Sequence, residues 1–467
     1  MRYALAAVLA ALVTCSPASA APAAWTKPVD ITDPRGYTIY LSDIAADRHG
    51  DVAAVGETYS KPDGVVVYSS HDRGQFDGEE VNDSGAEGPA ICFGRNGATY
   101  VLSHKVDFGN AIRVYTRPPG ARFGPEQLLD MRPGYPYGIA ASPRGDVIAY
   151  WTGSDLGGTV GGRVRVAVRP AGGRKFGPVQ DVSAPHQEAD YPGLLFDRRG
   201  NALLAWLADG RLEYAVRHPG GAFGPVRVLE PEVHYSTFDV AAGRDGRAVA
   251  VWRAHPGKHN ALRASFGSVA GGFGPPRRIG GKASRGPYVA VDRGGEAAVT
   301  WLAGSYPKFK LRAALAPAGS GRFGASHAIA GVYTDDFQAA ADGHGTLTIA
   351  WLDGGTMMAA RHRSGTRGFV KQSVAASPAR GMTMGTTADG RTVLLSKTIK
   401  KHIEAAVAKP RHGFGGATEI GHVRRGQTLD GPGFVAGGDG GAFAWWGVGA
   451  ADSDEGATWF TGSYLLP

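Results

Sequence analysis

The densest group of polar side chains suited to chemistry lies in one short stretch, His186-Gln187-Glu188-Ala189-Asp190-Tyr191. Two later stretches are of the same kind and contain His234 with Tyr235, and Asp335 with Asp336. Glycoside hydrolysis needs two carboxyl groups roughly 5 to 9 Å apart, one as the acid and the other as the base or nucleophile. Acidic loops are common in folded proteins, so these stretches favour ligand binding over catalysis.

Tyrosines recur between successive apolar runs of the chain, at positions 37, 135, 191, 235, 288 and 333. A tyrosine offers a flat face for stacking and a hydroxyl for hydrogen bonding, which suits a sugar or a peptide. The alternative is that each tyrosine only caps the start of a strand. The predicted ligand-binding residues are Tyr135, His186, Glu188, Asp190, Tyr191, His234, Tyr235, Tyr288, Tyr333, Asp335 and Asp336.

Patterns for metals and cofactors are sparse. Asp452 and Asp454 could bind Ca²⁺ through hard oxygen ligands, with a solvated acidic turn as the alternative. His255 and His259 have a spacing that a metal site allows, but no third ligand is identifiable. The chain has no Gly-rich phosphate loop, no His-Glu-x-x-His and no Gly-x-Ser-x-Gly. We therefore expect no cofactor, with calcium as the one weak candidate.

The first 20 residues have the pattern of a secretory signal peptide. Arg2 precedes a short apolar run, and Ala18-Ser19-Ala20 is a small-residue cleavage site. No later apolar stretch is long enough for a membrane helix. The predicted domains are therefore a signal peptide over 1–20 and a secreted domain over 21–467. Alternatively, Leu12-Val13-Thr14-Cys15 resembles a lipobox, which would leave the protein lipid-anchored through Cys15.

The formal net charge is +8, and cleavage after Ala20 would remove Arg2 and leave 8 − 1 = +7. The basic residues are scattered along the chain, which predicts a solubilising surface and no nucleic-acid partner. Cys92 would be the one cysteine of the mature chain. That excludes an intramolecular disulfide and a zinc site made of cysteine.

The chain contains an internal repeat that must position these side chains, and two recurring residue patterns, which we call marks, identify it. The first is a phenylalanine after a Gly-rich turn, usually followed by glycine, at 76, 123, 176, 223, 273, 323, 369 and 414. The second is a glycine that opens an apolar run, followed six residues later by tryptophan in six units, at 151, 206, 252, 301, 351 and 446. Two patterns that recur at similar intervals, and keep the same order within each unit, indicate a repeat architecture. The tryptophans are expected to pack between neighbouring sheets.

One unit shows the internal plan. Short apolar stretches over 193–197, 202–207, 212–217 and 223–229 are separated by turn signals, with no helical period between them. Four strands in a unit of this length are typical of a β-propeller blade. The sequence predicts an all-β fold, a single propeller of about nine four-stranded blades. Eight blades are the alternative, with one unit that lacks tryptophan standing outside the ring.

The two ends of the chain complement each other. Residues 25–31 resemble a lone fourth strand, whereas the last unit has three strands and no fourth. We therefore expect the N-terminal strand to complete the last blade and close the ring, which also removes an exposed sheet edge.

With this plan, the chain resembles bacterial secreted propellers with sialidase-like (Asp-box) repeats. Ser70-His71-Asp72-Arg73-Gly74-Gln75-Phe76 stands where an Asp-box stands but is one residue short. Asp454-Glu455-Gly456-Ala457-Thr458-Trp459 fits the motif better, at a different place in the blade. The Phe-Arg-Ile-Pro motif of sialidases is absent. The resemblance implies an extracellular propeller and a sialidase-like glycoside hydrolase or lyase as one possible activity.

The tyrosines, without a recognisable catalytic set, favour a non-catalytic binding or scaffold propeller at the cell envelope. Its expected ligand is a glycan or a peptide at the ring mouth, and the protein is expected to be a monomer. The alternatives are the sialidase-like enzyme and a scaffold that binds another envelope protein through the side of the ring. Arginines and two or three carboxylates that converge in one mouth would favour the enzyme.

Overall fold

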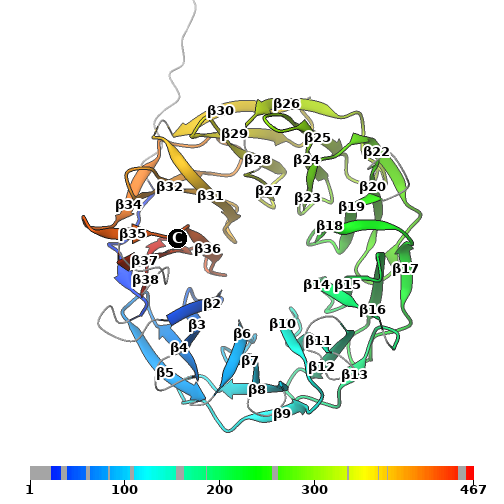
Figure 1. Cartoon of the computed structure of the whole chain (residues 1–467), viewed down its shortest axis with the longest axis vertical. Helices are drawn as coiled ribbons and strands as arrows, with labels where there is room; N and C mark the ends of the chain where they lie inside the picture. Colours follow the sequence, from blue (N-terminus) through cyan, green and yellow to red (C-terminus); the bar gives the residue numbers. More distant parts are fainter. Residues whose placement is uncertain are drawn as a thin grey trace, which may run out of the picture.

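The computed structural model describes residues 23–32, 39–58, 64–82, 85–105, 110–153, 162–185, 187–254, 261–333, 336–366, 368–375, 377–450 and 459–467. Within these residues, 38 strands form nine antiparallel sheets arranged around an open centre (Figure 1). The predicted signal peptide over 1–20 lies outside the described residues. Among the described residues, no helix has the length and apolarity that crossing a membrane requires.

Each of the first four blades follows the chain from the innermost strand to the outermost. Blade 1 contains β2 (Ile39–Ala46), β3 (Val52–Thr58), β4 (Gly64–Ser70) and β5 (Phe76–Asn82). Blade 2 contains β6 (Ala86–Phe93), β7 (Thr99–Lys105), β8 (Ala111–Arg117) and β9 (Gln127–Asp130). Blade 3 contains β10 (Tyr135–Ala141), β11 (Val147–Gly153), β12 (Arg163–Arg169) and β13 (Gln180–Asp181). Blade 4 contains β14 (Ala189–Phe196), β15 (Ala202–Ala208), β16 (Arg211–Arg217) and β17 (Arg227–Glu230).

The next four blades repeat this order. Blade 5 contains β18 (Val233–Ala242), β19 (Arg247–Ala254) and β20 (Ala261–Ser268), which pairs with both β21 (Gly272–Phe273) and β22 (Arg277–Lys282). Blade 6 contains β23 (Arg285–Val291), β24 (Ala297–Ser305), β25 (Lys308–Ala316) and β26 (His327–Val332). Blade 7 contains β27 (Phe337–Ala341), β28 (Thr346–Asp353), β29 (Thr356–Arg363) and β30 (Val370–Ala375). Blade 8 contains β31 (Ala379–Thr386), β32 (Thr392–Thr398), β33 (His402–Ala408) and β34 (Thr418–His422).

The ninth blade joins the two ends of the chain. Its strands β35 (Gln427–Leu429) and β36 (Gly433–Ala436) both pair with β37 (Ala442–Ala450), and β38 (Trp459–Leu465) follows. The N-terminal strand β1 (Val29–Asp30) then pairs antiparallel with β38 and completes the sheet. This confirms the prediction of nine blades closed by the N-terminal strand, and the alternative of eight blades is wrong.

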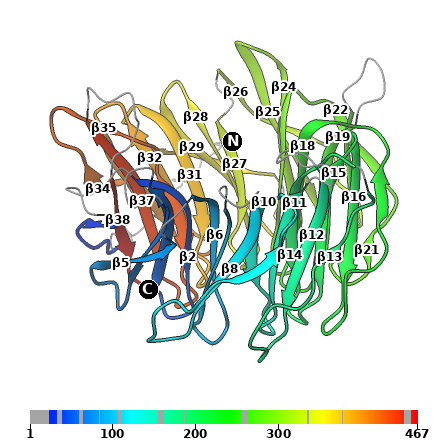
Figure 2. The ribbon, with the colours of Figure 1, turned by 60° about the horizontal axis from the view of Figure 1, so that its bottom comes forward.

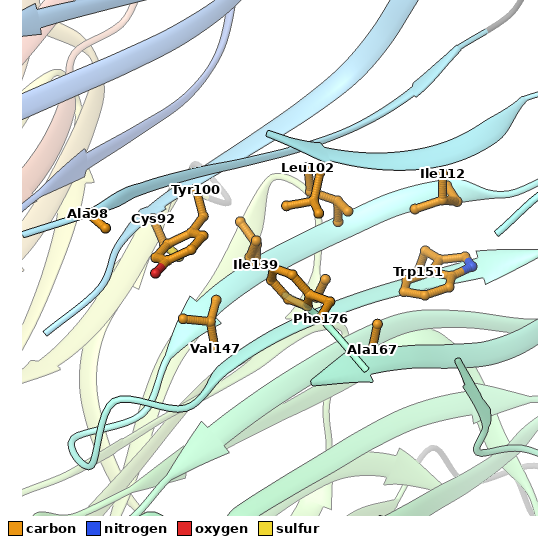
Figure 3. Close-up of a cluster of buried hydrophobic side chains, with 12 residues drawn as sticks. Cys92, Ala98, Tyr100, Leu102, Ile112, Ile139, Val147, Trp151, Ala167 and Phe176 are labelled. Carbon is orange, nitrogen blue, oxygen red and sulfur yellow. The ribbon is translucent and has the colours of Figure 1, made fainter. Parts of the chain in front are cut away.

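The hydrophobic core lies between successive blades. The six repeat tryptophans have at most 1% of their surface exposed. Figure 3 shows one of these junctions, in which Trp151 of blade 3 lies among side chains that include Leu102 and Ile112 of blade 2. Because a large aromatic ring fills the space between two twisted sheets, the tryptophan mark sets the packing of one blade on the next.

The phenylalanine mark is explained by hydrogen bonds across the same junctions. Gln127 Nε2 donates to the Phe176 carbonyl at 2.9 Å, and the Phe176 N–H donates to Gln127 Oε1 at 3.0 Å. A glutamine side chain of blade 2 is thereby hydrogen-bonded to the backbone of blade 3. The same pair of bonds joins Gln180 to Phe223 and Gln372 to Phe414.

Replacing Gln127 by alanine is expected to lower the free energy of unfolding by about 1–3 kcal/mol, because the Phe176 backbone loses two partners in a partly buried junction. The measurement is a denaturant titration. Gln75→Ala is the matched control, since Gln75 is exposed and forms no hydrogen bond within the described residues. Equal stability of the two variants would show that the paired bonds contribute nothing.

Candidate functional site

The central opening has two different ends, which we name by their residues. The inner strand of every blade begins at one end, near Tyr135 in blade 3 and Tyr191 in blade 4, and we call this end the tyrosine mouth. The inner strands finish at the other end in tight turns to the second strands, such as 47–50 in blade 1, and we call this end the turn mouth. Figures 1 and 2 show the inner strands side by side around the opening.

Four of the predicted tyrosines have exposed rings at the tyrosine mouth. The exposed fraction is 46% for Tyr135, 44% for Tyr191, 44% for Tyr288 and 66% for Tyr333. These tyrosines do not stand at equivalent positions of their blades. Tyr135 lies opposite Thr152 on the neighbouring strand, and Tyr191 lies where the pairing of β14 with β15 is irregular, with a φ of 53°. Tyr333 lies before the start of β27. Tyr37 lies outside the described residues, and the side chains of His234 and Tyr235 are also outside the description.

An aromatic cluster joins blades 2, 3 and 4 at this mouth. The Tyr135 ring packs edge-on against Tyr137 at 5.8 Å between centroids and lies 5.7 Å from the His104 ring. The Tyr137 hydroxyl donates to Asp190 Oδ1 of blade 4. Burial lowers the pKa of His104 and the charge of Glu57 only partly opposes it, so the imidazole is neutral at neutral pH. Sequence reasoning missed His104 and Tyr137, because neither stands in a polar loop.

The polar stretch around Glu188 does not form a cluster of available carboxylates. Asp190 accepts hydrogen bonds from the Tyr137 hydroxyl and from the Tyr191 N–H. The Gln187 side chain is buried and donates to Glu213. Glu188 is exposed, and its backbone N–H donates to Asp209 at 3.0 Å. His186 lies outside the described residues.

Two further carboxylates line the inner strands and were not predicted. Asp239 Oδ2 accepts the Val289 N–H of the next blade at 2.8 Å, and Asp43 Oδ2 accepts the Ile91 N–H at 2.9 Å. Burial raises the pKa of Asp239 to about 6 and also raises that of Asp43, although the backbone hydrogen bonds oppose the shift. They lie on β2 and β18, across the opening from each other (Figure 1). They are therefore not a pair of the kind that hydrolysis needs.

One cavity at the tyrosine mouth brings two predicted residues together. It has a volume of about 390 Å³ and lies between blades 7 and 8, where Tyr333 and Asp336 meet Arg380. The turn Gly354-Gly355 leaves room beside them, because neither residue has a side chain. The arrangement offers a flat ring, a carboxylate and a guanidinium to one ligand. Asp335 lies outside the described residues, and Arg380 was not predicted.

The metal predictions are not tested by the structure. Asp452, Asp454, His255 and His259 all lie outside the described residues. In the part of the chain that the structure does describe, no group of three or more His, Cys, Asp or Glu side chains is arranged to hold a metal ion.

No protein-family model and no curated protein sequence matches the chain. Solved structures match its fold. One described as the eukaryotic initiation factor has a TM-score of 0.51 at 9% identity and covers 84% of this chain and 91% of its own. Sqt1 from Chaetomium thermophilum has a TM-score of 0.46 at 14% identity, covering 96% and 100%. A polysaccharide lyase described as PL25 ulvan lyase has a TM-score of 0.43 at 10% identity, covering 84% and 98%. The chain is thus a β-propeller, and likenesses this distant carry the fold alone.

Proposed function

We propose that the protein is an exported, non-catalytic binding propeller of the cell envelope that recognises a glycan or a peptide at the tyrosine mouth. The observation that carries the proposal is the set of exposed tyrosine rings around this opening. Exposed flat rings beside a few polar groups are typical of ligand sites. The cavity of Tyr333, Asp336 and Arg380 is the place on this mouth that we propose for such a ligand.

The use of the carboxylates supports binding over hydrolysis. Asp43, Asp190 and Asp239 each accept a hydrogen bond that joins neighbouring blades. A carboxylate held in this way positions the backbone and is poorly placed to attack a substrate or to take its proton. The sialidase-like glycoside hydrolase or lyase is the alternative that this observation disfavours. Export, whether by secretion or with a lipid anchor at Cys15, rests on the sequence of the first 20 residues.

The test is a binding screen of the purified protein against sialosides, plant and cell-wall glycans, and peptides, read as a thermal shift and then by calorimetry. A ligand at the cavity is expected to lose about tenfold in affinity in Tyr333→Ala, because a stacked ring contributes on the order of 1 kcal/mol or more. Tyr306→Ala is the matched control, since Tyr306 is 77% exposed and lies in the turn between β24 and β25.

Each outcome has a distinct meaning. A bound glycan that is also cleaved or eliminated would replace the proposal with the hydrolase or lyase. A ligand whose affinity Tyr333→Ala leaves unchanged would place binding outside the cavity. If folded protein binds no member of the panel, the small-ligand proposal fails, and a scaffold that binds an envelope protein becomes the better hypothesis.

A further inference from the structure

The turn mouth carries a row of arginines. In six consecutive blades, 1 to 6, the turn that ends the inner strand contains an arginine one or two residues before the glycine that closes it. These glycines have positive φ, for example 88° at Gly50 and 87° at Gly246, which fixes the turn in one conformation. The turn of blade 4 contains two such arginines, Arg198 and Arg199. We take one arginine from each turn and call the set the basic arc: Arg48, Arg95, Arg144, Arg198, Arg244 and Arg293.

The side chains of the basic arc are exposed, and within the described residues none of them forms an ion pair. The carboxylates of the same turns are used elsewhere. Asp47 Oδ1 accepts the N–H groups of His49 and Asp51 in its own turn, and Asp292 Oδ1 accepts that of Glu296. The other turn carboxylates have partners outside the arc: Asp197 with Asn201, Asp245 with Arg247, Asp342 with Arg361, Asp389 with Arg391, and Asp439 with Arg73.

Arg244 is close enough to its two neighbours in the arc, Arg198 and Arg293, for their positive charges to act on it. Partial loss of contact with solvent lowers the pKa of Arg244, and the positive charges of Arg293 and Arg198 lower it further. In the part of the chain that the structure describes, no acidic group raises the pKa of Arg244. A cluster of like charges that the protein itself leaves uncompensated attracts anions from solution.

A cavity of about 470 Å³ lies at the same mouth, where the arc is interrupted. In blades 7 to 9, small residues stand in the turns in place of arginine: Gly343, Ala388 and Gly438. These small residues leave space for the cavity, and arginines line both of its flanks. Asp47 and Asp342 also line it, but both are buried and accept backbone N–H groups of their own turns. Arg244 and Arg293 come from blades 5 and 6 on one side, and Arg48 comes from blade 1 on the other.

We propose that this cavity binds a ligand that carries several oxyanion groups (phosphate, sulfate or carboxylate), held by Arg48, Arg244 and Arg293. Guanidinium groups bind such anions through paired, charge-assisted hydrogen bonds. A ligand with separated anionic groups can engage both flanks at once, whereas a single small anion engages one. The ligand is a small polyanion or the anionic end of a longer glycan whose remainder follows the arc. The proposal does not depend on the tyrosine mouth, which is at the other end of the ring.

The first test measures binding of sodium tripolyphosphate and of a short oligogalacturonate to the purified protein by calorimetry, at low and at physiological ionic strength. The double variant Arg244→Gln/Arg293→Gln is expected to bind at least about tenfold more weakly, because it removes two charge-assisted contacts. The matched control is Arg174→Gln/Arg322→Gln, which removes two exposed arginines from outer turns at the same end of the ring. The control is expected to retain affinity within about twofold, since distant surface charges are screened by salt.

A second pair of variants leaves every arginine in place. Ala388→Glu puts a carboxylate into the cavity and is expected to abolish binding, whereas Ala388→Gln adds the same bulk without charge and is expected to bind more tightly than Ala388→Glu. If tripolyphosphate binds more tightly than the oligogalacturonate, the ligand is a small polyanion. If the oligogalacturonate binds more tightly than tripolyphosphate, the ligand is an acidic glycan.

The proposal is overturned if neither probe binds, if the control loses as much affinity as the arc variant, or if Ala388→Glu and Ala388→Gln bind equally well.

Discussion

A chain that begins at residue 33 is expected to be less stable than one that begins at residue 23 by more than about 5 kcal/mol. It loses several hydrogen bonds, at roughly 1 kcal/mol each, and the buried side chain of Ile31, which contributes about 2–5 kcal/mol. Ile31 is 1% exposed, so its whole side chain is part of the core. The hydroxyls of Thr26 and Thr32 accept the N–H groups of Tyr464 and Phe460, each at 2.9 Å. The shorter chain is also expected to self-associate, because the unpaired edge of β38 is a template for another strand.

The measurement is thermal unfolding together with size-exclusion chromatography and light scattering on the two chains. Adding a peptide of residues 23–32 in trans is expected to restore a monomer and to raise the unfolding temperature. A peptide with Thr26→Val and Thr32→Val is the control and is expected to be weaker, because it leaves two backbone donors of β38 without acceptors. Equal stability and a monomeric state for both chains would mean that the ring does not depend on this strand.

The blades and the closure of the ring were predictable from the sequence because their signals are local. A turn glycine with positive φ and a buried second strand recur in each unit, and in six units a tryptophan stands six residues after the glycine, as in Gly200 and Trp206. The pairing of β1 with β38 was predictable because both ends of the chain were incomplete units of the same repeat. Counting units was then enough to give nine blades, since no contact between distant units had to be known.

The candidate sites were predictable only in part, because they depend on which units the ring brings together. Asp190 stood in a polar stretch, yet its carboxylate bonds to Tyr137 of the preceding blade, which no local pattern indicates. Arg380 joins Tyr333 and Asp336 only because blades 7 and 8 are adjacent. The tyrosines themselves were identifiable from their recurrence along the chain.

The basic arc shows how a periodic signal is missed. One arginine in each of six units looks scattered along the sequence, and we interpreted the basic residues as a general solubilising surface. The ring places equivalent turns at one mouth, so a residue that recurs once in a unit becomes a cluster in space. The signal was present in the chain as an arginine one or two residues before the turn glycine in six of the nine units, as in Arg48-His49-Gly50 and Arg244-Asp245-Gly246.

Replacing Trp151 by alanine is expected to lower the free energy of unfolding by about 3–5 kcal/mol, because it leaves a large cavity between blades 2 and 3. Phenylalanine at the same position is expected to cost less, since most of the ring volume remains. The indole Nε1 of Trp151 has no hydrogen-bond partner within the described residues, so Trp151→Phe loses packing alone.

Trp252 separates packing from hydrogen bonding at an equivalent position. Its Nε1 donates to Glu230 Oε2 at 2.9 Å, and Glu230 is 4% exposed. Trp252→Phe is therefore expected to cost about 1–2 kcal/mol more than Trp151→Phe, because a buried carboxylate loses one of its donors and keeps Arg263 as its partner among the described side chains. Denaturant titrations followed by far-ultraviolet circular dichroism measure both variants without depending on tryptophan fluorescence. Equal losses would show that solvent replaces the indole at Glu230, and a smaller loss for Trp252→Phe would contradict the assignment of that carboxylate as a structural acceptor.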